Sequence, residues 1–205
     1  MSRRLFHINA SPRGVRSRSD RVAQSFLEAL GKVEVERLDL SSAKLPEFDG
    51  TVIEGRYALL AGEAVAPETV ARWEEMGRLA RQLLAHDTWL ITTPMWNFGV
   101  PYRLKHYIDL VTHPGMLFNV TEEGVEGLAA GRTVIVIGAG ALDVEGVPEL
   151  AVLDHQIAYL RHWLEFIGVN DIRTLRVAPT YGPEEAVEQV MQAACNEAVK
   201  LAAML

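Results

Sequence analysis

The chain has 205 residues, of which 49% are hydrophobic and 23% are charged, and its formal net charge is −7 at pH 7. This composition is typical of a soluble globular protein with one sizeable core, and the acidic balance argues against a nucleic-acid partner. The single cysteine, Cys195, excludes an internal disulfide and a cysteine-based metal site, and its helical spacing predicts a buried, inert thiol. No apolar run reaches membrane-spanning length. We expect one cytoplasmic domain over residues 1–205.

Strand and helix signals alternate along the first half of the chain. Short apolar runs predict strands, and apolar residues spaced by three or four predict helices. The elements predicted here are a strand at residues 5–9, a helix at 20–30, a strand at 33–38, an amphipathic helix at 73–84 and a strand at 88–93. The long stretch at 41–67 is rich in proline and glycine, so we interpret it as an irregular lid or an interface arm.

The second half continues the alternation and completes a sheet. Its predicted elements are a helix at 101–112, two short β segments around a turn at 122–124, a strand at 132–137, a helix at 157–167, a strand at 172–177 and a helix that begins at Pro183. Five strands separated by helices predict right-handed crossovers and an α/β fold covered on both faces. We expect a flavodoxin-like doubly wound parallel sheet in the order 2-1-3-4-5, which binds ligands beyond the carboxyl ends of strands one, three and four.

The first loop at that edge, residues 10–19, carries hydroxyl groups to the start of a helix. Ser11, Ser17 and Ser19, with Arg18 beside them, lie where free N–H groups and the helix dipole attract an anion. The loop lacks the glycine patterns of a Rossmann dinucleotide site and of an NTPase phosphate loop. Serines in this position are often plain N-caps, but three hydroxyls with nearby arginines favour a monophosphate.

The second loop, residues 94–99, is the most informative feature of the chain. It reads Pro94-Met95-Trp96-Asn97-Phe98 and is followed by Gly99. One interpretation is a hydrophobic cover over the sheet edge. Such a cover needs neither a side-chain amide nor a bare backbone, so we favour a platform for a flat, partly polar ring.

The third loop, residues 138–143, is small and apolar, and on its own a glycine-rich strand exit is often a simple turn. Beside the other two loops, its main-chain groups are suited to the pyrimidine edge of a ring. A monophosphate at the first loop and a ring at the second describe flavin mononucleotide (FMN), which would itself carry the redox chemistry. No histidine pair has clear metal-ligand spacing; His155 and His162 are interpreted as surface or interface residues.

These residues resemble a known family, the FMN-dependent NADH azoreductases, also described as NADH:quinone oxidoreductases. The resemblance spans essentially the whole chain. It is carried by Ser11, Ser17-Arg18-Ser19, Pro94-Met95-Trp96-Asn97-Phe98, Leu104-Lys105, Tyr107-Ile108-Asp109, Thr121-Glu122-Glu123-Gly124, Gly127-Leu128 and Glu165-Phe166-Ile167-Gly168. It implies a flavodoxin-like homodimer with two active sites at the subunit interface, each holding non-covalent FMN.

The resemblance also implies roles for individual residues. The cofactor-binding residues would be Ser11, Ser17, Arg18 and Ser19 at the phosphate and ribityl chain, Pro94, Met95, Trp96, Asn97 and Phe98 at the isoalloxazine ring, and the main chain of Ala139, Gly140 and Ala141. The family usually carries a serine-arginine-glycine-glycine-like sequence where this chain has Ala139-Gly140-Ala141-Leu142. The substrate residues would be Phe118, Val120, where some relatives have a tyrosine, and Trp163, where relatives have an aromatic that reaches the partner's site.

We therefore expect a ping-pong enzyme that transfers hydride from NADH through FMN to quinones and azo compounds. No side chain needs to act as a nucleophile or general acid, and no metal is expected. The alternatives are an NADPH:FMN reductase, a nitroreductase-like enzyme and a non-enzymatic flavin-binding electron carrier. Electron carriers tend to be strongly acidic around the flavin edge, whereas this platform is apolar, so the sequence favours the enzyme.

Overall fold

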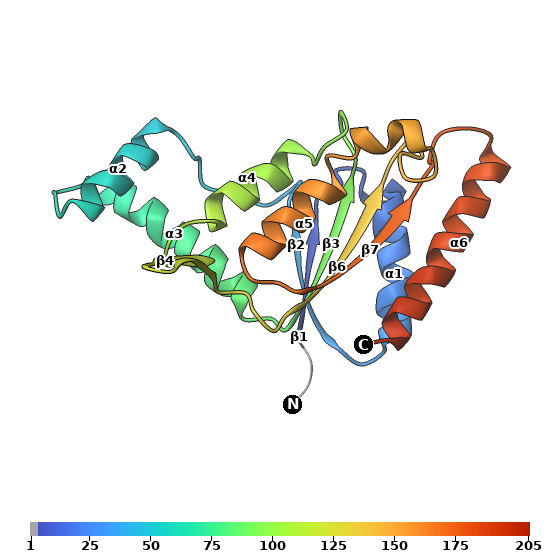
Figure 1. Cartoon of the computed structure of the whole chain (residues 1–205), viewed down its shortest axis with the longest axis horizontal. Helices are drawn as coiled ribbons and strands as arrows, with labels where there is room; N and C mark the ends of the chain where they lie inside the picture. Colours follow the sequence, from blue (N-terminus) through green and yellow to red (C-terminus); the bar gives the residue numbers. More distant parts are fainter. Residues whose placement is uncertain (1–3) are drawn as a thin grey trace.

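The computed structural model describes residues 4–205, which form a parallel sheet with helices on both faces (Figure 1). The sheet contains β1 (Arg4–Asn9), β2 (Glu34–Asp39), β3 (Thr88–Pro94), β6 (Thr133–Ala139) and β7 (Asp171–Val177) in the order β2-β1-β3-β6-β7. Counted as five strands in chain order, this is the predicted order 2-1-3-4-5. The α/β, flavodoxin-like prediction is confirmed.

Alternate side chains of the strands enter two separate cores, as expected for a sheet buried on both faces. Leu5 packs in a cluster with α1 (Arg18–Leu30) and α6 (Glu184–Ala203), which lie together on one face. Phe6 and Ile8 pack in a larger cluster with α3 (Pro67–Leu84), α4 (Tyr102–Val111) and α5 (Ile157–Phe166) on the other. Two short 3-10 helices, η1 (Gly14–Arg16) and η2 (Pro148–Leu153), lie in the connections.

The stretch at 41–67 is not irregular throughout, because it contains α2 (Gly50–Leu60). The carboxylate of Asp49 caps this helix by accepting a hydrogen bond from the N–H of Val52 at 3.0 Å. Gly55 does not break the helix; it allows close packing, since a Cβ at this position would overlap the side chain of Thr69 on α3. The interpretation failed because this helix has no polar face that would mark its period.

A short antiparallel hairpin, β4 (Phe118–Thr121) and β5 (Gly124–Gly127), forms at the predicted turn. The chain that leaves the hairpin is bonded to the end of α5, because the N–H of Ala129, two residues after β5, donates to the carbonyl oxygen of Ile167 at 2.8 Å. Gly127 lies so close to the main chain of Ile167 and Gly168 that a Cβ would overlap it. The hairpin therefore depends on a glycine at its last position.

Cys195 lies on α6 and is only partly buried, so the prediction of a buried thiol was wrong. The helix packs inward through Met191, Ala194 and Ala198, and Cys195 lies one residue around from this stripe. Among residues 4–205, no helix combines the length and apolar character needed to cross a membrane.

Candidate functional site

The three loops lie together at the edge of the sheet where the strands end (Figure 1). The main chain joins them directly: the N–H of Ala10 donates to the carbonyl oxygen of Thr92 at 2.8 Å, and the N–H of Met95 donates to that of Ala139 at 2.6 Å. These bonds connect the first loop to the end of β3 and the second loop to the third. The juxtaposition expected from the strand order is present.

The first loop presents hydroxyl groups at the N-terminus of α1. Ser11, Ser17 and Ser19 are almost fully buried, and Arg18 is partly exposed. The Ser17 hydroxyl oxygen caps α1 by accepting from the N–H of Asp20 at 3.3 Å, and it lies 3.3 Å from the Ser19 hydroxyl oxygen. Ser17 is therefore an N-cap of α1, as the simpler interpretation expected. Because these contacts are at the long end of hydrogen-bond distances, both hydroxyls retain capacity to bind an oxygen ligand.

The second loop is a tight turn with its aromatic rings partly in solvent. Trp96 and Gly99 exchange main-chain hydrogen bonds of 3.0 and 2.9 Å. Between them, Asn97 has a φ of 47° and Phe98 a φ of 69°, a conformation that non-glycine residues adopt mainly where the surroundings enforce it. The side chains of Trp96 and Phe98 are 41% and 40% exposed. A hydrophobic cover would bury them, so their exposure favours a binding platform.

The third loop has fewer free main-chain groups than expected. The N–H of Gly140 donates to the carbonyl oxygen of Val177 at 3.0 Å, and its carbonyl oxygen accepts from the N–H and hydroxyl of Thr180. The carbonyl oxygen of Ala139 already accepts from Met95. Of the three residues expected to contact a ring through the main chain, Ala141 is therefore the one left available, and it is exposed.

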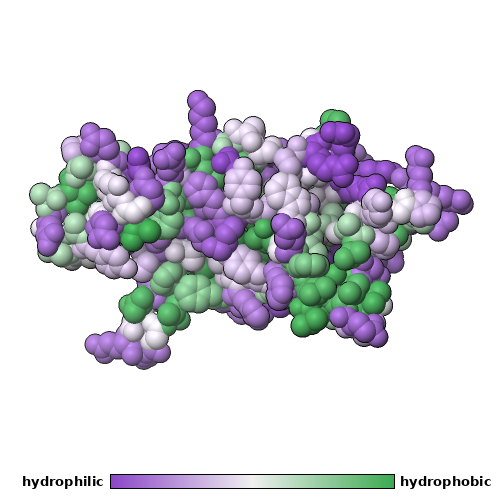
Figure 2. Space-filling view, turned by 90° about the horizontal axis from the view of Figure 1, so that it is seen from above, coloured by the Kyte–Doolittle hydropathy of each residue, from purple (hydrophilic) through white to green (hydrophobic). Residues whose placement is uncertain are grey.

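An exposed apolar patch continues from this loop. Figure 2 views the molecule from above, towards the edge where the strands end, and hydrophobic side chains gather at its lower right. Leu142, Val147 and Val152 are exposed along this segment. The third loop thus offers apolar surface beside the site.

A buried polar group supports the second loop and was missed by the sequence reasoning. The Gln156 side chain donates through Nε2 to the carbonyl oxygen of Thr93 at 3.3 Å and is fully buried. Arg176 on β7 donates to Gln156 Oε1 at 3.5 Å and forms ion pairs with Asp154 and with Glu145. These contacts fix the end of β3 beneath the platform. The partners are distant in sequence, so no local pattern could have shown them.

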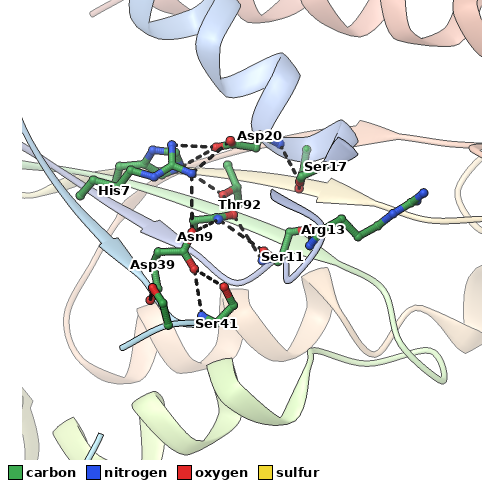
Figure 3. A network of polar contacts seen from close by, with 12 residues as sticks. His7, Asn9, Ser11, Arg13, Ser17, Asp20, Asp39, Ser41 and Thr92 are labelled. Carbon is green, nitrogen blue, oxygen red and sulfur yellow. Dashed lines mark hydrogen bonds and ion pairs between the residues drawn. The ribbon is translucent and has the colours of Figure 1, made fainter. Parts of the chain in front are cut away.

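A second polar cluster lies beneath the first loop, between α1 and the sheet (Figure 3). We call it the polar ladder; it comprises His7, Asn9, Arg37, Asp39 and Thr92. The Thr92 hydroxyl donates to Asn9 Oδ1 at 3.0 Å, so it accepts from His7 Nε2, also at 3.0 Å. Asn9 Nδ2 donates to Asp39 Oδ2 at 2.9 Å. Asn9 therefore has its amide orientation fixed and can hold the first loop, where its Oδ1 accepts from the N–H of Ser11 at 3.3 Å.

The ladder has a defined charge at neutral pH. Burial and, to a lesser extent, the charge of Arg37 lower the pKa of His7 to about 4, so the imidazole is neutral at pH 7. Burial alone would raise the pKa of Asp39, but hydrogen bonds from Ser41 and Asn9 and the charge of Arg37 lower it, so this carboxylate is ionised. Arg37 is thus the cation of the ladder.

The expected substrate residues lie away from the platform, at the far end of a groove that begins beside it. Two adjoining cavities of about 430 and 400 Å³ run between α4 and α5; Gly99 lines the first, and Tyr159 and His162 line both. Trp163 lines the far cavity and donates through Nε1 to the Thr112 hydroxyl oxygen at 2.9 Å. We call these two cavities the α4–α5 groove. It connects the platform with Trp163.

The other two expected substrate residues are on the hairpin beyond this groove. Phe118 packs edge-on against Phe166, which lines the far cavity, with ring centroids 4.9 Å apart. Val120 is exposed on β4. His155 and His162 are exposed and line the near cavity, which agrees with their interpretation as surface residues. The structure does not bring Phe118 or Val120 to the platform of their own chain.

Comparison with known proteins places this architecture in a family. Residues 3–201 match the family model described as flavodoxin-like fold. The chain is 38% identical to the FMN-dependent NADH:quinone oxidoreductase of Desulfotalea psychrophila, covering 97% of this chain and 96% of the relative. It is also 38% identical to FMN-dependent NADH:quinone oxidoreductase 2 of Pseudomonas syringae pv. tomato, over 97% of both.

Solved structures agree. An FMN-dependent NADH-azoreductase from Bacillus anthracis, crystallised in complex with FMN, superposes with a TM-score of 0.90 at 25% identity over 98% of both chains. An azoreductase from Bacillus anthracis strain Sterne has the same fold, with a TM-score of 0.89 at 22% identity over 100% of both chains. The resemblance predicted from the motifs is therefore confirmed, and the chain belongs to the flavodoxin-like family of FMN-dependent NADH:quinone oxidoreductases.

Proposed function

We propose that this protein is an FMN-dependent enzyme that transfers electrons from NADH to quinones and azo compounds. The observation that carries the proposal is the meeting of two features at one edge of the sheet. Buried serine hydroxyls at the N-terminus of α1 suit a phosphate, and the exposed aromatic turn at 96–99 suits a ring. The names of relatives that are 38% identical over nearly the whole chain support the same cofactor and donor.

The residues present fit FMN in the following way. Ser11, Ser17 and Ser19 would bind the phosphate and ribityl chain, with Arg18 adding positive charge. Pro94, Met95, Trp96, Asn97 and Phe98 would hold the ring, and Ala141 would offer its main chain, with less from Ala139 and Gly140. Bound FMN supplies the redox chemistry by accepting electrons from a reduced nicotinamide and giving them to an acceptor. The protein contributes position and a water-poor surface beside the ring.

We further infer a ping-pong order in which NADH and the acceptor use the same position in turn. The side chains of the platform offer no nucleophile or titrating acid, so stacking on an aromatic surface is what both partners require. Initial-rate measurements at several acceptor concentrations would give parallel lines in double-reciprocal plots. Intersecting lines would contradict this order.

Steady-state rates separate the proposed activity from the alternatives. We expect turnover with NADH and a quinone or an azo dye to exceed turnover with NADH and free FMN. A highest rate with NADPH and free FMN would instead indicate a flavin reductase. Flavin bleaching only in the presence of a partner protein would indicate an electron carrier.

We also propose that the protein is a homodimer. The exposed side chains of Ile53, Tyr57 and Leu59 on α2 support this, because a group of large apolar side chains in solvent is typical of a contact surface. The α4–α5 groove supports it too, since it is open to a second copy and has Trp163, itself nearly buried, in the lining of its far cavity. The roles of Phe118, Val120 and Trp163 as substrate residues are part of this proposal.

Light scattering tests the dimer. We expect the mass of two chains for the wild-type protein and a shift towards one chain for Tyr57→Asp, which places a charge on the apolar surface of α2. Glu54→Asp on the same helix is the matched control and should leave the mass unchanged. A one-chain mass for the wild type at working concentration would exclude the dimer.

We propose that residues 1–205 form a single FMN-binding domain in the cytoplasm. Packing of the first helix, α1, against the last, α6, supports one cooperative unit. The lone Cys195 supports a reducing compartment. One unfolding transition by fluorescence and circular dichroism, and recovery in the soluble cell fraction, are the expected results; two separate transitions would contradict the single domain.

A further inference from the structure

The edge strand β2 lies outside the first loop, but two of its side chains bind residues at the ends of that loop. Arg37 pairs in register with His7, and Asp39 with Asn9, so these residues lie on the same face of the sheet, under α1. Asp39 binds Asn9, which holds the beginning of the loop at Ser11. Arg37 binds Asp20, which lies just beyond its end. Two residues of β2 therefore hold opposite ends of the loop.

Asp20 places a buried carboxylate beside the hydroxyl groups of the first loop. Its carboxylate is almost fully buried in the first turn of α1, and its N–H donates to the Ser17 hydroxyl oxygen at 3.3 Å. A negative charge here interacts favourably with the helix dipole, as a phosphate does. The same charge therefore repels a phosphate bound by Ser17 and Ser19 unless another group neutralises it.

Arg37 is the group that neutralises it. Its guanidinium Nη1 lies 3.0 Å from Asp20 Oδ1, and its Nη2 donates to Asp20 Oδ2 at 3.1 Å, which is a two-point ion pair. The neighbouring His7 Nε2 lies 3.8 Å from Asp20 Oδ1. This imidazole is neutral at pH 7, as shown above, and contributes no charge. The carboxylate of Asp39 is the second negative charge near Arg37, with Oδ2 3.9 Å from Nη2. Within the ladder, Arg37 is the only cation that balances it.

We infer that Arg37 is a positioning residue for the FMN phosphate, which acts by neutralising and holding Asp20 at the first turn of α1. The inference rests on the proposed function, since it concerns affinity for that cofactor. It gives a role to a residue on an edge strand outside the three loops. The effect is specific to the phosphate, because the charge of Asp20 opposes a dianion and not the neutral ring.

The test compares FMN with riboflavin, which lacks the phosphate, in fluorescence titrations of flavin-free full-length protein. Arg37→Gln is expected to weaken FMN binding about tenfold and to change riboflavin binding less than about twofold. Asp20→Asn is expected to tighten FMN binding about threefold. The double variant is expected to bind FMN within about twofold of the wild type, because both charges of the pair are removed together.

Arg21→Gln is the matched control. Like Arg37→Gln it removes one positive charge, but this charge lies on α1 and its only ion pair within residues 4–205 is an exposed one with Glu188. It should change FMN affinity less than about twofold. Equal loss of FMN and riboflavin in Arg37→Gln, or no loss of either, overturns the inference while leaving the proposed function intact. If Arg37→Gln does not fold, unchanged FMN affinity in Asp20→Asn overturns it. Wild-type protein that binds no FMN overturns both.

Discussion

Replacing Gly127 with alanine is expected to destabilise the protein by at least about 3 kcal/mol, the upper range for overpacking a close contact. The added Cβ would overlap the main chain of Ile167 and Gly168, and no change of rotamer can remove a backbone clash. The hairpin β4–β5 would have to move away from the end of α5. Urea unfolding followed by tryptophan fluorescence measures the loss.

Gly50→Ala is the matched control for this substitution. A Cβ at Gly50 has no neighbour within 4 Å, and the residue begins α2. Its effect on the free energy of unfolding is expected to stay within about 0.5 kcal/mol. If the two variants were equally stable, the close approach of β5 to α5 described above would be wrong.

Asn97→Val is expected to weaken FMN binding by about 5- to 150-fold. The φ of Asn97 is 47°, which asparagine tolerates and a β-branched residue does not. The strain of about 1 to 3 kcal/mol would be relieved by opening the turn and displacing Trp96 and Phe98, which corresponds to that range of affinity. Fluorescence titration with FMN measures the change.

Asn97→Gly separates the two contributions of this residue. Glycine accepts the same φ, so the turn should remain and only the contact of the amide with the ring should be lost. We expect an affinity between those of the wild type and Asn97→Val. If the Asn97→Val variant bound FMN as tightly as the wild-type protein, the turn at 96–99 would not be the ring platform.

The sheet could be predicted from the sequence because its strands are short apolar runs separated by amphipathic helices. Buried parallel strands of this kind need no long-range information to be recognised. The position of the three loops followed from the strand order alone, because ligands of doubly wound sheets bind at the carboxyl ends of the strands. The bonds from Ala10 to Thr92 and from Met95 to Ala139 agree with that expectation.

Other features depend on contacts that a sequence pattern does not contain. The helix α2 lacks a polar face, and its Gly55 resembles a breaker until its packing against Thr69 is seen. The hydrogen bond of Gln156 to Thr93 and the ion pair of Arg37 with Asp20 join residues on different elements. The free groups of the third loop were overestimated for the same reason, since Val177 and Thr180 occupy those of Gly140.

The most direct measurement is the visible absorption spectrum of the purified protein after incubation with FMN and removal of free flavin. We expect the spectrum of bound oxidised flavin, its bleaching when NADH is added without oxygen, and its return when a quinone follows. A colourless protein, or a bound flavin that NADH leaves unchanged, would contradict the assignment of the three loops to an NADH-reducible FMN site.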